Sequence, residues 1–264
     1  MNIETAEAPK AAALRALHVP GEPLVLPNAW DAASALLIEE AGFPAVATSS
    51  AAIAVTLGWG DGEAAPVEDM LAAAGRIARS VTVPVTVDFE RGYGLKPAEL
   101  VERLAATGAA GLNLEDSDPA TGAMVDAGQQ ADFLAAVRAA GRAGRIDLVI
   151  NARTDSFLRR AGTPQEQLAA TVDRGSRYLA AGADCVYPLG VTAPEVIRAL
   201  VEAIPGPVNV ARGPQADLSL AALAGLGVAR VTFGPSLQRQ VYGQFASATL
   251  QALIDERSSV ASTR

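Results

Sequence analysis

The chain has few of the side chains on which many enzyme mechanisms depend. Among its 264 residues there are one histidine (His18), one cysteine (Cys185) and two lysines (Lys10 and Lys96). A Ser-His-Asp triad, a histidine zinc site and a Schiff-base lysine on a core strand are therefore disfavoured. A single cysteine excludes an intramolecular disulfide and a multi-thiolate metal site within one chain.

Positive charge and long apolar runs are also scarce. The formal net charge of −8 argues against a nucleic-acid or anionic membrane partner but allows a small anionic substrate. No apolar run approaches the roughly 20 residues of a membrane helix, and the N-terminus lacks the pattern of a signal peptide. We expect a cytoplasmic protein that acts on a small molecule.

What the chain does have is a regular alternation of short apolar runs with alanine- and leucine-rich amphipathic segments. The predicted strands are 24–28, 44–49, 84–89, 111–115, 147–152, 184–188, 207–211 and 229–233. The predicted helices are 31–41, 67–80, 97–107, 129–143, 164–181, 192–203, 217–225 and 235–256. Strands that alternate with helices pair in parallel through right-handed crossovers.

Eight such units predict a single-domain (β/α)8 TIM barrel over residues 1–264, with flexible ends at 1–9 and 257–264. An open doubly wound sheet is the alternative, but no G-x-G-x-x-G motif follows the first strand. Thr163 has Glu166 three residues later, the spacing of a helix capping box.

Polar side chains end three neighbouring strands, at the barrel face where active sites lie. Residues two apart on an extended strand share a face, and the pairs are Asp88 with Glu90, Asn113 with Glu115, and Asn151 with Arg153. Several carboxylates at one barrel mouth repel one another unless a cation lies between them, and oxygen ligands favour Mg²⁺. The alternative is that these carboxylates cap helices or pair with arginines.

The motifs resemble the isocitrate lyase/phosphoenolpyruvate mutase superfamily, in particular its phosphoenolpyruvate phosphonomutase-like members. The matching stretches are 26–34, 42–50, 57–61, 87–94 (Val-Asp-Phe-Glu-Arg-Gly-Tyr-Gly), 111–116 (Gly-Leu-Asn-Leu-Glu-Asp) and 151–154 (Asn-Ala-Arg-Thr). They cover the first five βα units in order, whereas the last three units match only in general pattern.

The resemblance implies a Mg²⁺ ion and a set of site residues. The metal residues are Asp88, which binds the ion directly, and Asp61, Glu90 and Glu115, which reach it largely through water. The substrate-binding residues are Ser49, Ser50, the amide of Ala51, Asn113, Asn151 and Arg153. The catalytic residues are Arg153, Glu115 and Tyr93, and enolate protonation is open between water, Tyr93 and Tyr187. The resemblance also implies a homo-dimer or homo-tetramer in which subunits exchange the last helix.

One loop departs from the family pattern. The C–C lyases carry a Lys-Lys/Arg-Cys-Gly motif after the fourth strand, but residues 116–125 contain neither lysine nor cysteine. Leu189 stands where the lyases have a glutamate.

The leading hypothesis is a Mg²⁺-dependent enzyme that cleaves a C–C bond of a small 2-oxo acid through an enolate, such as an oxaloacetate-like decarboxylase. The alternatives are C–P chemistry (a phosphonomutase, a carboxyphosphonoenolpyruvate-type transfer or a phosphonopyruvate hydrolase) and a non-catalytic barrel that binds metal and carboxylate.

Overall fold

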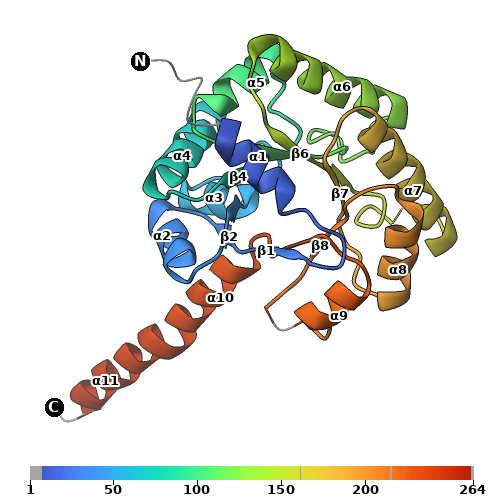
Figure 1. Ribbon diagram of the computed structural model, residues 1–264. Coiled ribbons are helices and arrows are strands. Elements are labelled where there is room, and N and C mark those ends of the chain that lie inside the picture. Colours follow the sequence, from blue (N-terminus) through green and yellow to red (C-terminus); the bar gives the residue numbers. More distant parts are fainter. Residues whose placement is uncertain (1–7, 161, 215, 263–264) are drawn as a thin grey trace.

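A computed structural model describes residues 8–160, 162–214 and 216–262, in which parallel strands are surrounded by helices (Figure 1). The strands are β1 Leu24–Leu26, β2 Asn28–Ala29, β3 Val46–Thr48, β4 Val85–Asp88, β5 Gly111–Leu114, β6 Val149–Thr154, β7 Cys185–Pro188, β8 Asn209–Ala211 and β9 Arg230–Thr232. The helices before the last strand are α1 Ala8–Ala16, α2 Ala32–Glu40, α3 Ser50–Thr56, α4 Val67–Ser80, α5 Pro97–Ala105, α6 Ala127–Gly144, α7 Pro164–Ala180, α8 Pro194–Ala203 and α9 Leu220–Gly225.

The strands follow the order of a TIM-like barrel. One sheet has the order β2-β3-β4-β5-β6-β7 and the other β1-β9-β8, with every pair parallel. Pro27 separates β1 from β2 because it has no N–H to donate, so the first predicted strand is divided between the two sheets. A parallel bridge between Val186 and Val208 connects β7 with the start of β8. The predicted parallel α/β class is confirmed.

The outer helices pack on the strands through apolar stripes. On α4 and α5 the buried side chains recur every three or four residues, as an amphipathic helix requires: Met70, Ala74, Ile77, Leu100 and Leu104. They belong to one core cluster with Leu112, Leu114 and Ile150 of the strands. Burying each leucine or isoleucine contributes about 2 kcal/mol, so this contact holds α4 and α5 against the strands.

Two short helices were not predicted. Helix α1 lies across one end of the strands (Figure 1), and α3 follows β3 directly, where the sequence suggested a strand continuing to residue 49. The predicted capping box is confirmed at the start of α7, where Thr163 and Glu166 bond each other's backbone amides.

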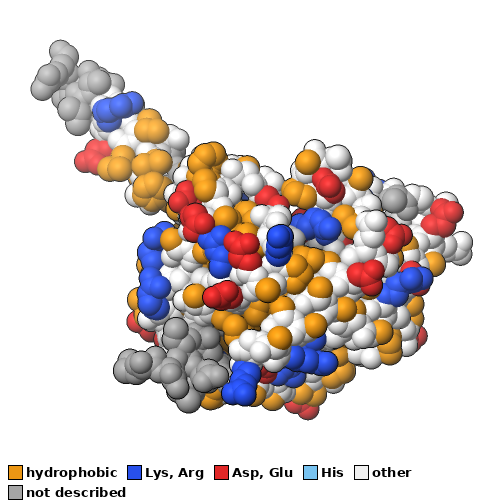
Figure 2. Space-filling model, turned by 90° about the horizontal axis from the view of Figure 1, so that it is seen from above, with side chains coloured by type: hydrophobic (Ala, Val, Ile, Leu, Met, Phe, Trp, Pro, Cys, Tyr) orange, Lys and Arg blue, Asp and Glu red, His pale blue; other side chains and the backbone are white. Residues whose placement is uncertain are grey.

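The last helical segment leaves the body of the molecule. Helix α10 (Ser236–Gln244), the π-helical segment η2 (Phe245–Leu250) and α11 (Gln251–Ser262) form one rod that projects from the barrel (Figures 1 and 2). It carries six exposed large apolar side chains: Val241, Tyr242, Phe245, Leu250, Leu253 and Ile254. Exchange of this helix between subunits remains a prediction.

The ends of the chain were expected to be flexible. Residues 8–9 belong to α1 and residues 257–262 to α11, while 1–7 and 263–264 lie outside the described residues. The single-domain assignment stays a prediction. In the described part of the chain, no helix is both long and apolar enough to cross a bilayer.

Candidate active site

A row of three polar side chains crosses the inner strands β4, β5 and β6. Strand register places Asn113 beside both Asp88 and Asn151. The amide nitrogen of Asn151 donates to Asn113 Oδ1 at 2.9 Å, and the amide nitrogen of Asn113 lies 3.4 Å from Asp88 Oδ1. The parallel sheet therefore brings together three residues that are far apart in sequence.

Asp88 is held by the polar residues that follow β3. Its backbone N–H donates to Thr48 Oγ1 at 2.9 Å. The backbone N–H and the hydroxyl of Ser50 both donate to Asp88 Oδ2, at 3.0 and 2.8 Å. Ser49 caps α3, and the amide of Ala51 lies in the first turn of that helix. These contacts fix one carboxylate oxygen and leave Oδ1 facing the weaker Asn113 contact.

Glu90 occupies a tight turn after β4. The predicted extended backbone from Asp88 to Glu90 is wrong, because β4 ends at Asp88 and Glu90 has a left-handed φ of 47°. Its carboxylate accepts from the Tyr93 hydroxyl at 2.5 Å and from the Glu63 N–H at 2.6 Å. Burial raises the pKa of Glu90 to about 7; the Tyr93 hydrogen bond opposes the shift, and the charges of Asp88 and Asp61 add to it.

Arg153 on β6 lies between two carboxylates. Its Nη1 is 2.5 Å from Glu115 Oε2, and its Nε and Nη2 donate to the two oxygens of Asp155 at 2.7 and 3.0 Å. Burial by itself lowers the pKa of Arg153, but the charges of Glu115 and Asp155 outweigh it and raise the pKa. Burial raises the pKa of Glu115 to about 8 despite the opposing charge of Arg153.

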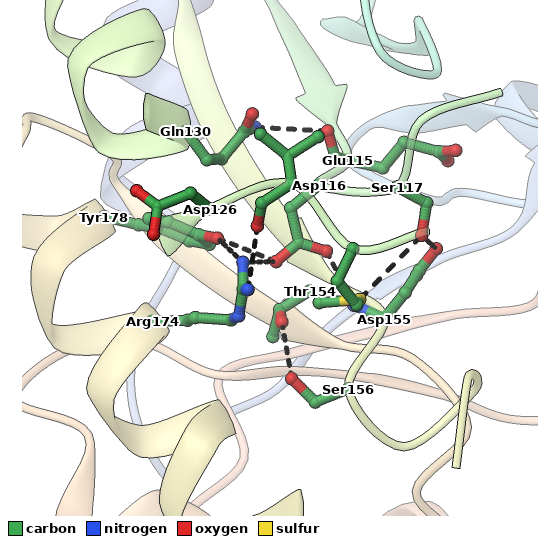
Figure 3. Close-up of polar contacts among 12 residues, drawn as sticks. Glu115, Asp116, Ser117, Asp126, Gln130, Thr154, Asp155, Ser156, Arg174 and Tyr178 are labelled. Atoms are coloured by element: carbon green, nitrogen blue, oxygen red, sulfur yellow. Dashed lines mark hydrogen bonds and ion pairs between the residues drawn. The ribbon is translucent and has the colours of Figure 1, made fainter. Parts of the chain in front are cut away.

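A buried network fastens the segment after β5 to β6 and α7 (Figure 3). Asp116 Oδ1 accepts from the Asp155 N–H at 2.9 Å. Asp116 Oδ2 accepts from the Tyr178 hydroxyl at 2.7 Å and lies 3.1 Å from Arg174 Nη1. The Ser117 hydroxyl donates to Asp155 Oδ2 at 2.7 Å. Asp155 thus touches both Arg153 and this network.

The loop that lacks lysine and cysteine folds back on itself. Ser117 and Met124 form an antiparallel bridge, and the Asp118 N–H donates to the Ala123 carbonyl at 2.8 Å. Arg174 Nη2 donates to the Val125 carbonyl at 2.8 Å, which ties the end of the loop to α7.

A buried arginine contacts the row from β9. Arg230 has no exposed surface, and its Nη2 lies 3.3 Å from Asn113 Oδ1. Its Nη1 lies 3.5 Å from His18 Nε2, while His18 Nδ1 is 2.8 Å from the Leu14 carbonyl. Burial, followed by the charge of Arg230, lowers the pKa of His18 to about 4. The single histidine is therefore a neutral structural residue at neutral pH.

Comparison with known proteins shows which family the chain belongs to. A family model described as phosphoenolpyruvate phosphomutase matches residues 14–253. The chain belongs to this family. The predicted membership of the isocitrate lyase/phosphoenolpyruvate mutase superfamily is thereby confirmed.

Relatives of known sequence and structure carry several names. An uncharacterized protein of Mycobacterium tuberculosis is 34% identical over 218 residues, 83% of this chain and 80% of the relative. The 2-methylisocitrate lyase of Escherichia coli is 30% identical, covering 74% of this chain and 67% of the lyase. A candidate phosphonomutase of Burkholderia cenocepacia is 43% identical with a TM-score of 0.84, covering 93% of this chain and 99% of that one. An oxaloacetate acetylhydrolase in complex with oxalate is 26% identical with a TM-score of 0.81, covering 92% and 86%.

The donor set of this family member suits a hard divalent cation. The polar groups at the strand ends are carboxylate and amide oxygens, and burial with mutual repulsion raises the pKa values of Glu90 and Glu115. A cation would relieve that repulsion. Among the described residues, no three His, Cys, Asp or Glu side chains are placed to hold an ion directly. This is compatible with one direct ligand, Asp88, and the other carboxylates reached through water.

The remaining predicted residues lie at the same face or close to it. Asp61 is exposed, and its charge contributes to the raised pKa of Glu90. Tyr187 is buried on β7, where burial raises its pKa. Leu189 follows β7, and its N–H donates to the Thr154 carbonyl at 3.0 Å. The roles of these residues remain predictions.

Three further residues that support the site were not predicted. Asp155 orients Arg153, Thr48 binds the Asp88 backbone, and Glu63 accepts from the backbone N–H groups of Arg91 and Tyr93 at 3.0 and 2.7 Å. Asp155 lies two residues after Arg153, so the same-face rule that selected Asn151 and Arg153 also selects it. No local pattern marks Glu63, which reaches the turn from a separate loop.

Proposed function

We propose that this protein is a Mg²⁺-dependent lyase that cleaves a C–C bond of a small 2-oxo acid of the oxaloacetate type. The observation that carries the proposal is the placement of Arg153 next to a group of buried carboxylates. A guanidinium has five N–H donors, and three nitrogens of Arg153 contact Glu115 and Asp155. The donors that remain suit a substrate carboxylate. The names of the E. coli lyase and of the oxaloacetate acetylhydrolase support the same class of reaction.

The site residues bind the cation and the substrate through separate groups. Asp88, fixed by Ser50 and Thr48, would hold the cation. When bound, the cation supplies Lewis-acid stabilisation of the negative charge that develops on the enolate oxygen. Arg153 holds the substrate carboxylate, with its orientation set by Asp155. Ser49, Asn113 and Asn151 supply further polar groups for the substrate oxygens.

Tyr93 is the group that we assign to protonation of the enolate. In decarboxylation the C–C bond to the departing carboxylate breaks, carbon dioxide leaves, and the electron pair of that bond stays on the enolate, whose carbon then takes a proton. Burial, with the nearby charge of Glu90, raises the pKa of Tyr93, so its hydroxyl stays protonated. Glu90 accepts a hydrogen bond from that hydroxyl at 2.5 Å, so it orients the tyrosine and lies within reach to return the proton.

The C–P alternative has its own support. The family description and the Burkholderia structure both name phosphomutase chemistry. Segment 116–125 lacks the lysine and cysteine of the C–C lyases, and the phosphonate enzymes of the resemblance also carry lysine there. We prefer decarboxylation because it needs an electron sink more than it needs the missing loop acid. Incubation with phosphonopyruvate followed by phosphorus NMR separates the two: release of phosphate or a rearranged ester would establish C–P chemistry.

Thermal unfolding of metal-stripped protein tests the site itself. We expect Mg²⁺ and oxalate, an enolate mimic, to raise the midpoint together by a few degrees or more at about a hundred times the dissociation constant. Asp88→Ala should abolish this increase. Asp132→Ala is a matched control, because Asp132 is exposed on α6 and its side chain makes no hydrogen bond to the residues that the structure describes.

Activity measurements complete the test. Oxaloacetate and longer 2-oxo acids should be turned over by the wild type and not by Asp88→Ala. If neither ligand stabilises the protein and no 2-oxo acid is consumed, the carboxylates are structural and the lyase proposal fails.

A further inference from the structure

A polar cavity lies at the end of the barrel opposite the candidate active site. It has a volume of about 630 Å³ and lies where the chain enters β6 and β7. Its charged lining consists of Arg15, Arg138, Arg142, Arg145, Asp147 and Asp184. In a chain of net charge −8, this is a local surplus of positive charge.

Both aspartates in the cavity are already paired. Asp147 accepts from Nη1 and Nη2 of Arg15, each at 2.7 Å. Asp184 accepts from Arg15 Nε at 2.7 Å, from Arg138 Nη2 at 2.5 Å and from the Ile150 N–H at 2.8 Å. Neither carboxylate is therefore available to neutralise further cations.

Arg138 is also fully engaged. Its Nε donates to the Gly182 carbonyl and its Nη1 to the Leu148 carbonyl, each at 2.9 Å. Gly182 permits this close approach, because it has a φ of +103° and a Cβ at that position would lie 3.0 Å from Arg138 Cγ. Arg15 and Arg138 thus form a rigid wall with the two aspartates.

Arg142 and Arg145, unlike Arg15 and Arg138, are not engaged by carboxylates or carbonyls of the cavity wall. Within the described part of the chain, neither side chain has a hydrogen bond or an ion pair, and both are exposed at the cavity rim. Arg142 lies in the last turn of α6, and Arg145 is the left-handed residue that ends it, with a φ of 56°. Two guanidinium groups three residues apart remain for a ligand.

The rest of the lining is small and apolar. Gly141, Ile146, Gly182 and Ala183 complete the cavity beside the arginines and aspartates. A volume of about 630 Å³ exceeds the need of a single phosphate and falls within the range of small-molecule sites. The cavity therefore offers guanidinium forks for an anionic group and apolar surface for the remainder of a molecule.

We propose that this cavity binds a soluble phosphorylated metabolite, with Arg142 and Arg145 holding its phosphate groups. Guanidinium forks match the geometry of phosphate oxygens and bind them with charge-assisted hydrogen bonds. The ligand does not compete with substrate. Asp147 precedes β6, whereas Arg153 lies near the far end of this six-residue strand, which spans roughly 20 Å.

Titration calorimetry with pyrophosphate and with ADP, in EDTA, tests the proposal on the full-length protein. Both probes should bind, and raising the salt concentration should weaken binding. The double variant Arg142→Gln/Arg145→Asn should weaken it by about tenfold or more, since each lost contact is a hydrogen bond between charged groups. Asn is tolerated in the left-handed conformation of residue 145.

The matched control is Arg76→Gln/Arg79→Asn. These two arginines are also exposed, also three residues apart, and lie on α4 away from the cavity. Their replacement should leave both affinities unchanged. The proposal is overturned if neither probe binds, or if binding survives the 142/145 double variant.

Discussion

Asp155 joins the substrate-facing arginine to the buried network behind it. Its carboxylate accepts hydrogen bonds from Nε and Nη2 of Arg153 and from the Ser117 hydroxyl. The Asp155 side chain has no exposed surface. In Asp155→Asn an amide donor would face the guanidinium in place of an acceptor oxygen. We expect oxalate affinity and kcat/KM on the 2-oxo acid to fall by about a hundredfold, equivalent to roughly 3 kcal/mol.

The control for that variant is Asp173→Asn, which removes one charge from an exposed Arg–Asp pair on α7 and should leave both quantities unchanged. A folded Asp155→Asn protein that binds oxalate as tightly as wild type would show that Asp155 is structural only.

His18 predicts a pH dependence of stability. Its pKa is about 4 in the folded protein, against an ordinary value of about 6.5. Between those pH values the unfolded chain takes up a proton that the folded chain does not, so stability falls as the pH is lowered from about 6.5 towards 4. The loss from this residue approaches roughly 3 kcal/mol at the lower end and is absent above pH 7.

Urea unfolding at a series of pH values measures this effect. In His18→Gln the free energy of unfolding should decline less steeply between pH 6.5 and 4 than in wild type, because the titrating group is gone. Carboxylates titrate in both proteins, so the difference between the two curves reports His18. Parallel curves would contradict the assignment of a neutral buried ring.

For single site residues, the sequence was informative where the rule that places them is local. Asp88 and Asn113 could be predicted as neighbours because parallel strands end at one face. Their supporting contacts could not, because the Asp88–Ser50 and Asp116–Tyr178 hydrogen bonds join residues 38 and 62 positions apart. Burial and charge of those partners also set the pKa values, which no spacing reveals.

Helix α7 begins with a capping box that contributes to the stability of the fold. Thr163 Oγ1 accepts from the Glu166 N–H at 3.3 Å, and Glu166 Oε2 accepts from the Thr163 N–H at 2.7 Å. Thr163→Ala removes the first contact and should lower the free energy of unfolding by about 1 kcal/mol. Chemical denaturation measures the change, with Thr163→Ser as a control that retains the cap. Equal losses in both variants would contradict a capping role.

The elements themselves were largely predictable because each has a strong local signal. Helices with apolar residues every three or four positions, such as α4 and α5, were placed within two residues at each end. Helix α3 was missed because its seven residues are too few to show a period and it directly follows an apolar strand. The division of β1 from β2 depends on which neighbour each half pairs with, and Pro27 alone does not reveal that.

The projecting helix exposes apolar side chains that favour association of subunits. Its apolar residues, among them Phe245 and Leu253, are 54% and 57% exposed, which is costly for side chains of this size in water. We expect a homo-dimer or homo-tetramer in which another copy covers them. Light scattering should show a lower mass for Phe245→Glu/Leu253→Glu. Gln244→Glu, on the same helix, should leave the mass unchanged.

A wild-type protein that is monomeric at micromolar concentration would contradict this expectation. So would an unchanged mass in the double glutamate variant.

If a second copy covers the rod at residues 236–262, the stability of the protein depends on its own concentration. Folding and association then become one equilibrium, so the unfolding midpoint rises with the concentration of the protein itself. Dilution would therefore lower the unfolding midpoint of this protein.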